Sequence, residues 1–269
     1  RSSDLEVMQA ATRAGAKQLL IGLGGSGTVD GGAGMLAALG VRFLDADGKE
    51  LPPTPAGLAS LDRADVGGLD PGLAGVEIVV LTDVDNPLTG PHGASAVFGP
   101  QKGLEKTDID AMDAHLGHLA AVIDTARPLR RPVDTPGAGA AGGLGFALDC
   151  VLGGEARMGA TYLADLVELD EAIAASQLVI TGEGQIDGQT SRGKVVAEVV
   201  GRARHLGVPV VAVAGSVDCS EEELAAIGLD DARALCEGSI TLDQAMAEPA
   251  RWITARTQAL VTDHLARRG

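Results

Sequence analysis

Apolar residues along this chain follow two alternating patterns: short continuous runs and longer segments with helical spacing. The continuous runs are typical of parallel strands buried on both faces, and they are KQLLIGL at 17–23, VEIVVLTDV at 76–84, QLVITGEG at 177–184 and PVVAVAGSV at 209–217. The helically spaced segments predict helices over residues 4–15, 31–40, 104–126, 142–153, 164–176, 193–207 and 241–267. This alternation predicts an α/β protein with a parallel sheet in its C-terminal third.

Turn and cap residues refine this prediction. VRFLDADGKEL (41–51) predicts a hairpin around Asp47–Gly48, which would make the N-terminal sheet mixed. Asp108 stands where it would cap the 104–126 helix, and Ser220 with Glu223 forms the pattern of a capping box. A chain of 269 residues suits one large or two ordinary domains, and we expect a boundary near 165–176.

Composition narrows the class of partner. The net charge of −16 argues against nucleic acid and against an anionic membrane surface, but a small anionic ligand needs only a few local donors. No apolar run is as long as a membrane span. The three cysteines have no metal-type spacing, which favours reduced thiols and a cytoplasmic location. Gly accounts for 38 residues and clusters in loops, which indicates close backbone approach there.

The first of these loops lies in LLIGLGGSGTVDGGAGM (19–35), which contains the dinucleotide fingerprint G-x-G-x-x-G over Gly22–Gly27. Asp45 lies about 20 residues farther on, where a ribose-binding acid is expected. However, a second glycine run delays the helix, Asp30 would put negative charge near the pyrophosphate, and Asp45 suits the DADG turn equally well. A dinucleotide site, a structural turn and an anion- or metal-phosphate-binding loop all stay open, and the residues favour the last.

A second loop, 81–103, follows the 76–84 strand. Asp83 and Asp85 are two residues apart, so in an extended chain they point the same way and suit Mg²⁺ or a general base. The alternative is that DNP is only a turn former. Lys102, flanked by glycines, is a candidate contact for phosphate or carboxylate.

Two more loops carry candidate chemistry. The third, 134–145, offers backbone donors and space. The fourth, 178–195, has P-loop spacing in GQTSRGK but places Val195 where a Ser or Thr should bind Mg²⁺. The carboxylates in this loop still suit a metal ion, and its Arg and Lys side chains suit phosphate. The alternative is a solvated charged turn capped by Thr190.

Together, four motifs in order resemble the bacterial glycerate kinase family, type 1: IGLGGSGTVDGGAGMLAALG, TDVDNPLTGPHGASAVFGPQKG, PGAGAAGGLG and LVITGEGQIDGQTSRGK. The resemblance spans the chain from about residue 4 to the last helix. It implies two α/β domains, an inserted mixed one at 1–175 and a flavodoxin-like (Rossmann-like) one to which 176–269 contribute. Family members also carry an N-terminal segment with a DSFKGS-like motif that this sequence does not contain, so we expect the flavodoxin-like domain to be incomplete here. Val29 and Gln185 replace the family's usual Asn and Arg.

The resemblance implies ATP-dependent phosphorylation of D-glycerate, with 2-phosphoglycerate as the favoured product and ATP and Mg²⁺ as cofactors. The residues expected to bind phosphate or the glycerate carboxylate lie in or beside the glycine loops: Gly24, Gly25, Ser26, Thr28, Asp30, Gly31, Gly32, Gly139 and Gly142. The cations expected to neutralise the transferring phosphoryl group are Lys102, Arg192 and Lys194. The carboxylates expected to hold Mg²⁺ or accept the hydroxyl proton are Asp83, Asp85, Glu183 and Asp187, with Asp83, Glu183 and Asp187 as the metal ligands.

Two alternatives of other classes stay open. One is a non-catalytic relative that binds a small sugar acid, and the other is a nicotinamide-dependent oxidoreductase. Whether the protein forms a homo-oligomer is also open.

Overall fold

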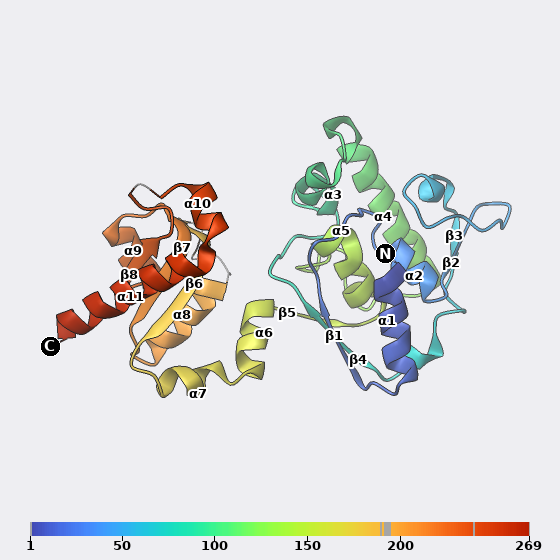
Figure 1. The fold of residues 1–269 in the computed structure, drawn as a ribbon. Coiled ribbons are helices and arrows are strands. Elements are labelled where there is room, and N and C mark those ends of the chain that lie inside the picture. The colour runs from blue at the N-terminus through green and yellow to red at the C-terminus, as the bar shows by residue number, and fades with distance from the viewer. Residues whose placement is uncertain (1, 189, 191–194, 239, 269) are drawn as a thin grey trace. The chain divides into compact units, whose positions relative to one another are not determined.

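The computed structural model describes residues 2–188, 190, 195–238 and 240–268. The chain forms two compact units, 1–159 and 160–269, here called the N-terminal and C-terminal units (Figure 1). The two units meet at 159/160, since residues 160–175 are tied to the C-terminal unit, and the expected division of the family's two domains at 175/176 stays a prediction. Arg202, which is only 14% exposed, makes ion pairs of 2.6 Å with Asp165 and 3.1 Å with Asp170.

The N-terminal unit contains the elements α1 (Ser2–Arg13), β1 (Gln18–Gly22), α2 (Ala33–Ala38), β2 (Arg42–Leu44), β3 (Arg63–Asp65), β4 (Glu77–Leu81), α3 (Ala94–Phe98), α4 (Ile109–Ala126), α5 (Ala140–Gly145) and β5 (Glu155–Arg157). β4 is the central strand of a parallel sheet with the order β1-β4-β5. In its register Gly22 of β1 pairs with Leu81 of β4, and Leu81 pairs with Arg157 of β5. The three strands therefore end at the same edge of the sheet, and the loops that follow them begin there.

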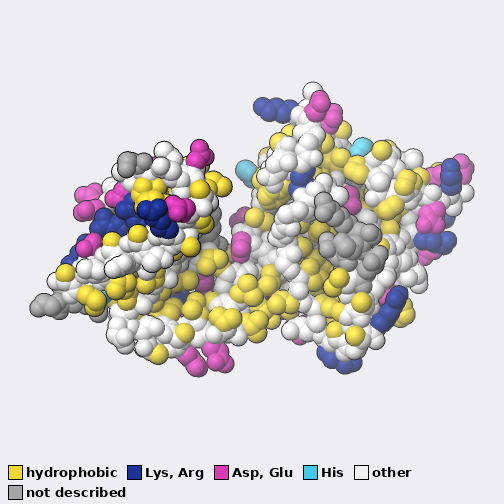
Figure 2. Space-filling model, in the orientation of Figure 1, with side chains coloured by type: hydrophobic (Ala, Val, Ile, Leu, Met, Phe, Trp, Pro, Cys, Tyr) yellow, Lys and Arg dark blue, Asp and Glu magenta, His cyan; other side chains and the backbone are white. Residues whose placement is uncertain are grey.

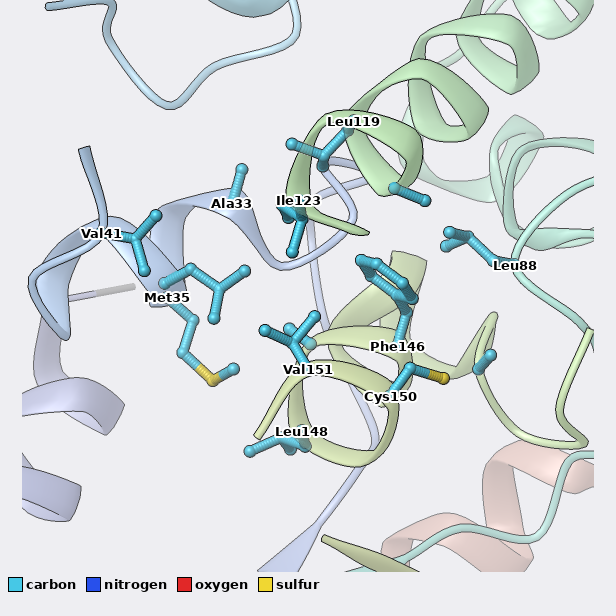
Figure 3. Close-up of a cluster of buried hydrophobic side chains, with 14 of the residues drawn as sticks. Ala33, Met35, Val41, Leu88, Leu119, Ile123, Phe146, Leu148, Cys150 and Val151 are labelled. Carbon is cyan, nitrogen blue, oxygen red and sulfur yellow. The ribbon is translucent and has the colours of Figure 1, made fainter. Parts of the chain in front are cut away.

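The core of this unit lies between α2, α4 and the turn of π-helix over Phe146–Val151. Met35, Ile123 and Phe146 point into it together (Figure 3). Phe146 and Ile123 are fully buried. The loop between β1 and α2 packs against this core, since Val29 in that loop is 8% exposed and belongs to the same cluster.

The predicted hairpin is confirmed only in part. The turn is present, with Gly48 at φ +81° and the Asp45 amide donating to the Lys49 carbonyl at 3.0 Å. The returning segment, however, makes a single antiparallel bridge, from Leu44 to Glu50. The main partner of β2 is β3, so the unit has a separate two-stranded antiparallel sheet in place of one mixed sheet.

The C-terminal unit contains the elements α6 (Gly159–Leu166), α7 (Leu169–Ala174), β6 (Val179–Ile186), α8 (Val195–His205), β7 (Val210–Val217), α9 (Glu221–Ile227), β8 (Asp231–Ala234), α10 (Leu242–Ala247) and α11 (Pro249–Arg268), the first residue of α6 being the last of the N-terminal unit. The parallel sheet predicted for this region is confirmed, in the order β6-β7-β8. Alternate residues of β7 pack in different clusters: Ala212 with α8 and α9, and Val211 with Leu260 of α11. β7 is thus apolar throughout because both of its faces are buried.

Charged side chains tie α11 to this sheet. Arg233 of β8 lies 3.0 Å from Asp263, and Arg267 lies 3.0 Å from Asp231. On the face seen in Figure 2, Lys and Arg side chains of the C-terminal unit accordingly lie beside Asp and Glu. The acidic chain uses part of its charge in such internal pairs.

Several predicted helices are corrected. Segment 164–176 is broken where Glu168 takes a left-handed φ of +54°, and segment 241–267 is broken before Pro249, which begins α11. Segment 142–153 becomes α5, which has left-handed residues inside it, followed by π-helix. Asp108 stands at the N-cap of α4 but makes no side-chain cap hydrogen bond, whereas the capping box of Ser220 and Glu223 is present. Strand β8 was not predicted.

Candidate functional site

The loop after β1 has an open half and a buried half. Gly24, Gly25 and Thr28 are exposed, and Cβ atoms built on Gly24 and Gly25 meet no described atom within 4 Å. Gly25 has φ +61°, which only glycine adopts readily. This half of the loop therefore presents its backbone and the Thr28 side chain to solvent, with Ser26 partly exposed beside them, as an anion-binding loop requires.

The second half of this loop supports the first. The two carboxylate oxygens of Asp30 accept hydrogen bonds of 3.1 Å from the amides of Gly32 and Gly34, which caps the start of α2. Gly31 and Gly32 are buried, and a Cβ on Gly31 would lie 2.7 Å from a methyl group of Leu119. Asp30, Gly31 and Gly32 thus have a structural role here, and their contact with a ligand stays a prediction.

This geometry also bears on the dinucleotide interpretation. α2 begins at Ala33, well past the end of the fingerprint at Gly27. Asp45 uses its carboxylate in the turn, where one oxygen accepts from the amides of Asp47 at 3.0 Å and Lys49 at 2.8 Å. Neither the helix start nor the acid is placed as a pyrophosphate and ribose would need.

Lys102 joins the second loop to the first. It lies in a short 3₁₀ turn after α3, and its Nζ donates to the Ser26 hydroxyl at 2.7 Å and to the Thr28 carbonyl at 2.9 Å. Partial burial lowers the pKa of Lys102, and the nearby Asp30 carboxylate opposes that shift. A lysine that is held and partly desolvated beside an open glycine loop is suited to an anionic ligand.

The third loop holds the other two together. The Gly142 carbonyl accepts from the Gly31 amide at 3.0 Å, and the Gly139 amide donates to the Asn86 carbonyl at 2.8 Å. A Cβ on Gly142 would collide with the Thr28 carbonyl, and one on Gly139 would collide with the Pro87 carbonyl. Gly139 and Gly142 thus permit close approach between loops, and ligand binding by their amides stays a prediction.

The aspartates after β4 are placed differently from the expectation. β4 ends at Leu81 and the chain bends at Asp83, so the alternation of an extended strand does not extend to Asp83 and Asp85. Both are exposed. Asp83 Oδ1 accepts a 2.9 Å hydrogen bond from the Gly159 amide, just after β5. Asp83 therefore lies at the edge where the three parallel strands end.

In the C-terminal unit, Glu183 and Asp187 lie in and just after the carboxyl-terminal half of β6, which ends at Ile186, two residues beyond the predicted end. Thr190 connects them: its hydroxyl donates to Glu183 Oε1 at 2.9 Å and accepts from the Asp187 amide at 3.0 Å. The sequence indicates only a capping role for Thr190, and nothing in it signals the hydrogen bond to Glu183. Arg192 and Lys194 lie outside the described residues.

The carboxylates of the C-terminal unit could supply one or two ligands to Mg²⁺ but not a complete coordination shell. Within the described ranges, no three His, Cys, Asp or Glu side chains gather as a metal cluster. Mg²⁺ commonly keeps several waters and takes one or two carboxylates plus substrate phosphates. Glu183 and Asp187 fit that pattern better than a closed protein cage.

The fold and loops define an α/β protein that gathers an open glycine loop, a held lysine and an aspartate where parallel strands end, as ligand-binding α/β proteins do. The sequence profile of the glycerate kinase family matches residues 6–264, and the chain belongs to this family. It is 42% identical to a glycerate kinase of Bacillus subtilis strain 168, over 93% of this chain and 66% of that protein. It is also 42% identical to the glycerate 2-kinase of Escherichia coli K12, over 89% of this chain and 63% of that protein.

A solved structure agrees. A crystal structure of a Salmonella typhimurium LT2 protein designated glycerate kinase 2 superposes with a TM-score of 0.76 at 40% identity, covering 98% of this chain and 69% of that one. The chain thus spans about two thirds of the length of these relatives. No helix within the described residues has the length and apolarity to cross a membrane.

Proposed function

We propose that this chain carries the ligand-binding loops of an ATP-dependent D-glycerate kinase that forms 2-phosphoglycerate. The observation that carries the proposal is the Lys102 ammonium group, held by Ser26 and Thr28 beside an open glycine loop. Phosphoryl transfer asks a protein chiefly for positioning and charge neutralisation, and this arrangement offers both. The E. coli relative is a glycerate 2-kinase, which supports the 2-hydroxyl as the acceptor.

The roles follow from the chemistry of the residues. The exposed backbone of Gly24 and Gly25 with the Ser26 and Thr28 hydroxyls would bind the glycerate carboxylate or a phosphate. Lys102 would neutralise charge on the transferring phosphoryl group. The new bond joins the glycerate hydroxyl oxygen to the γ-phosphorus, the bond from that phosphorus to the β,γ-bridging oxygen breaks, and ADP leaves.

Carboxylates complete the proposal. Asp83 or Asp85 would accept the proton released by the attacking hydroxyl group. Glu183 and Asp187 would hold Mg²⁺, and the bound ion would offset the charge of the nucleotide phosphates. Arg192 and Lys194 remain expected partners of the phosphoryl group.

Lys102→Met tests the central observation. It removes a charged donor, for which hydrogen bonds contribute about 1.5–3 kcal/mol, so kcat/KM should fall about 10- to 100-fold. The assay couples ADP release to NADH oxidation with D-glycerate as acceptor, and ³¹P NMR distinguishes 2- from 3-phosphoglycerate. Lys106→Met is the matched control, since Lys106 is exposed in the 3₁₀ turn that precedes α4.

The outcomes separate the alternatives. Unchanged kcat/KM in Lys102→Met would remove this lysine from the site. Calorimetric binding of D-glycerate without any ADP release would favour the non-catalytic alternative instead. Binding of NADH at millimolar concentration would revive the oxidoreductase.

A further inference from the structure

Thr190 is a polar residue that is completely buried at a point where the chain otherwise meets solvent. It is 0% exposed, whereas Gly188 beside the same turn is exposed. Its backbone amide donates to the Asp187 carbonyl at 3.0 Å, and its hydroxyl oxygen accepts from the Asp187 amide at 3.0 Å. Backbone and side chain of one residue thus close the turn that carries Asp187.

The hydroxyl has one hydrogen, and that hydrogen is given to Glu183. The donor–acceptor distance from Thr190 Oγ1 to Glu183 Oε1 is 2.9 Å. Because the hydroxyl oxygen accepts from the Asp187 amide, the direction in which its hydrogen points is set by the turn. The hydrogen bond therefore fixes the Glu183 carboxylate relative to Asp187.

Glu183 itself is anchored by the sheet. It lies inside β6 and pairs with Ala214 of β7, so its backbone is held on the strand. What the sheet leaves to rotate is the side chain, and the Thr190 hydroxyl restrains it at one oxygen. Oriented ligands of this kind bind cations more tightly because less rotational freedom is lost on binding.

We propose that Thr190 is a positioning residue, which orients the Glu183 carboxylate for the Mg²⁺ that accompanies the nucleotide. This inference rests on the proposed function in so far as Glu183 is a metal ligand. Thr190 does not touch the ligand. It acts through the hydrogen bond to Glu183, and loss of such an outer partner typically weakens metal affinity or activity about 10- to 100-fold.

Thr190→Val and Thr190→Ser test this pair of contacts. Valine keeps the volume and removes the hydroxyl, whereas serine keeps the hydroxyl. The primary readout is Mn²⁺ binding in the presence of ATP, measured by electron paramagnetic resonance without glycerate. The Mn²⁺ dissociation constant should rise about tenfold or more in Thr190→Val and stay within about threefold of the wild type in Thr190→Ser.

A double-mutant cycle with Glu183→Gln identifies the route. If Thr190 acts through Glu183, the variant with both Thr190→Val and Glu183→Gln should bind Mn²⁺ as weakly as Glu183→Gln alone. Additive losses would overturn the inference, and so would wild-type Mn²⁺ binding in Thr190→Val. Thermal melting of each variant identifies any that fails to fold, and Thr190→Ala, which also lacks the hydroxyl, then replaces Thr190→Val in the cycle.

The result is also separable from the proposed function. A wild-type chain that binds Mn²⁺ with ATP but transfers no phosphoryl group to D-glycerate would refute the substrate assignment and leave this inference intact. A wild-type chain that binds no Mn²⁺ with ATP would overturn the inference itself.

Discussion

Gly142 lies where the third loop crosses the first, and Gly142→Ala should disturb stability and ligand binding together. Its φ is +73°, in the left-handed region, and its carbonyl accepts a 3.0 Å hydrogen bond from the Gly31 amide. A Cβ at this position would collide with the Thr28 carbonyl and lie 3.0 Å from Lys102 Nζ. Thr28 supplies one of the two acceptors that hold Lys102.

The expected destabilisation follows from two terms. An alanine in the left-handed conformation lowers the free energy of unfolding by about 1–2 kcal/mol. Displacing the backbone at this crossing would also break the Gly31–Gly142 hydrogen bond, which contributes about 1 kcal/mol. The collision is with backbone, so no side-chain rotation relieves it. Together the terms give about 2–3 kcal/mol, or a melting temperature lower by roughly 5–10 °C for a unit of this size.

Calorimetric melting and the ADP-release assay measure the two effects. Gly24→Ala is the matched control, because it lies in the first loop and its Cβ would meet no described atom within 4 Å. It should melt within about 1 °C of the wild type, since neither term applies. Gly142→Ala should also weaken D-glycerate or nucleotide binding, because Thr28 and Lys102 move with the crossing. Wild-type melting and binding in Gly142→Ala would refute the close approach.

Two further predictions concern carboxylates. Asp83→Asn and Asp187→Asn should each lower turnover about 10²- to 10⁴-fold with little change in melting temperature, and wild-type turnover in either variant would remove that residue from the site. Asp149 is 2% exposed, and its carboxylate lies 2.9 Å from Arg131 Nε in an ion pair without hydrogen-bond geometry. Burial raises the pKa of Asp149 more than the neighbouring Arg131 lowers it. The folded state therefore holds this proton to higher pH than the unfolded state does, and ionisation of Asp149 lowers stability as pH rises above about 4. The free energy of unfolding in urea of Asp149→Asn, relative to that of the wild type, should therefore increase from pH 4 to 7. A difference that does not change with pH would contradict this prediction.

Local sequence patterns predicted the helices and strands well where neighbouring residues determine the backbone conformation. The continuous apolar runs became β1, β4, β6 and β7, and the box of Ser220 and Glu223 caps α9. Predictions were wrong where one residue's conformation depends on packing, as at Glu168, whose left-handed φ of +54° divides the 164–176 segment into α6 and α7. Nothing in the sequence near Glu168 signals that break.

The candidate site divides in the same way. Glycine-rich loops after strands, and the presence of Lys102 in one of them, could be found from the sequence because strand ends and loop composition are local properties. The sequence could not show which of these glycines face solvent and which lie where two loops cross. Gly24 is open, whereas Gly142 meets Thr28 more than a hundred positions away in the chain.

From its sequence alone, this chain is an α/β protein with the ordered motifs of the glycerate kinase family. Tertiary structure decided that Lys102 is held by Ser26 and Thr28, and that Gly142 lies against the Thr28 carbonyl. The reason is physical. Secondary structure follows from interactions between near neighbours, but a charged amine such as that of Lys102 takes its role from whichever distant residues the packing of the core brings within hydrogen-bond reach.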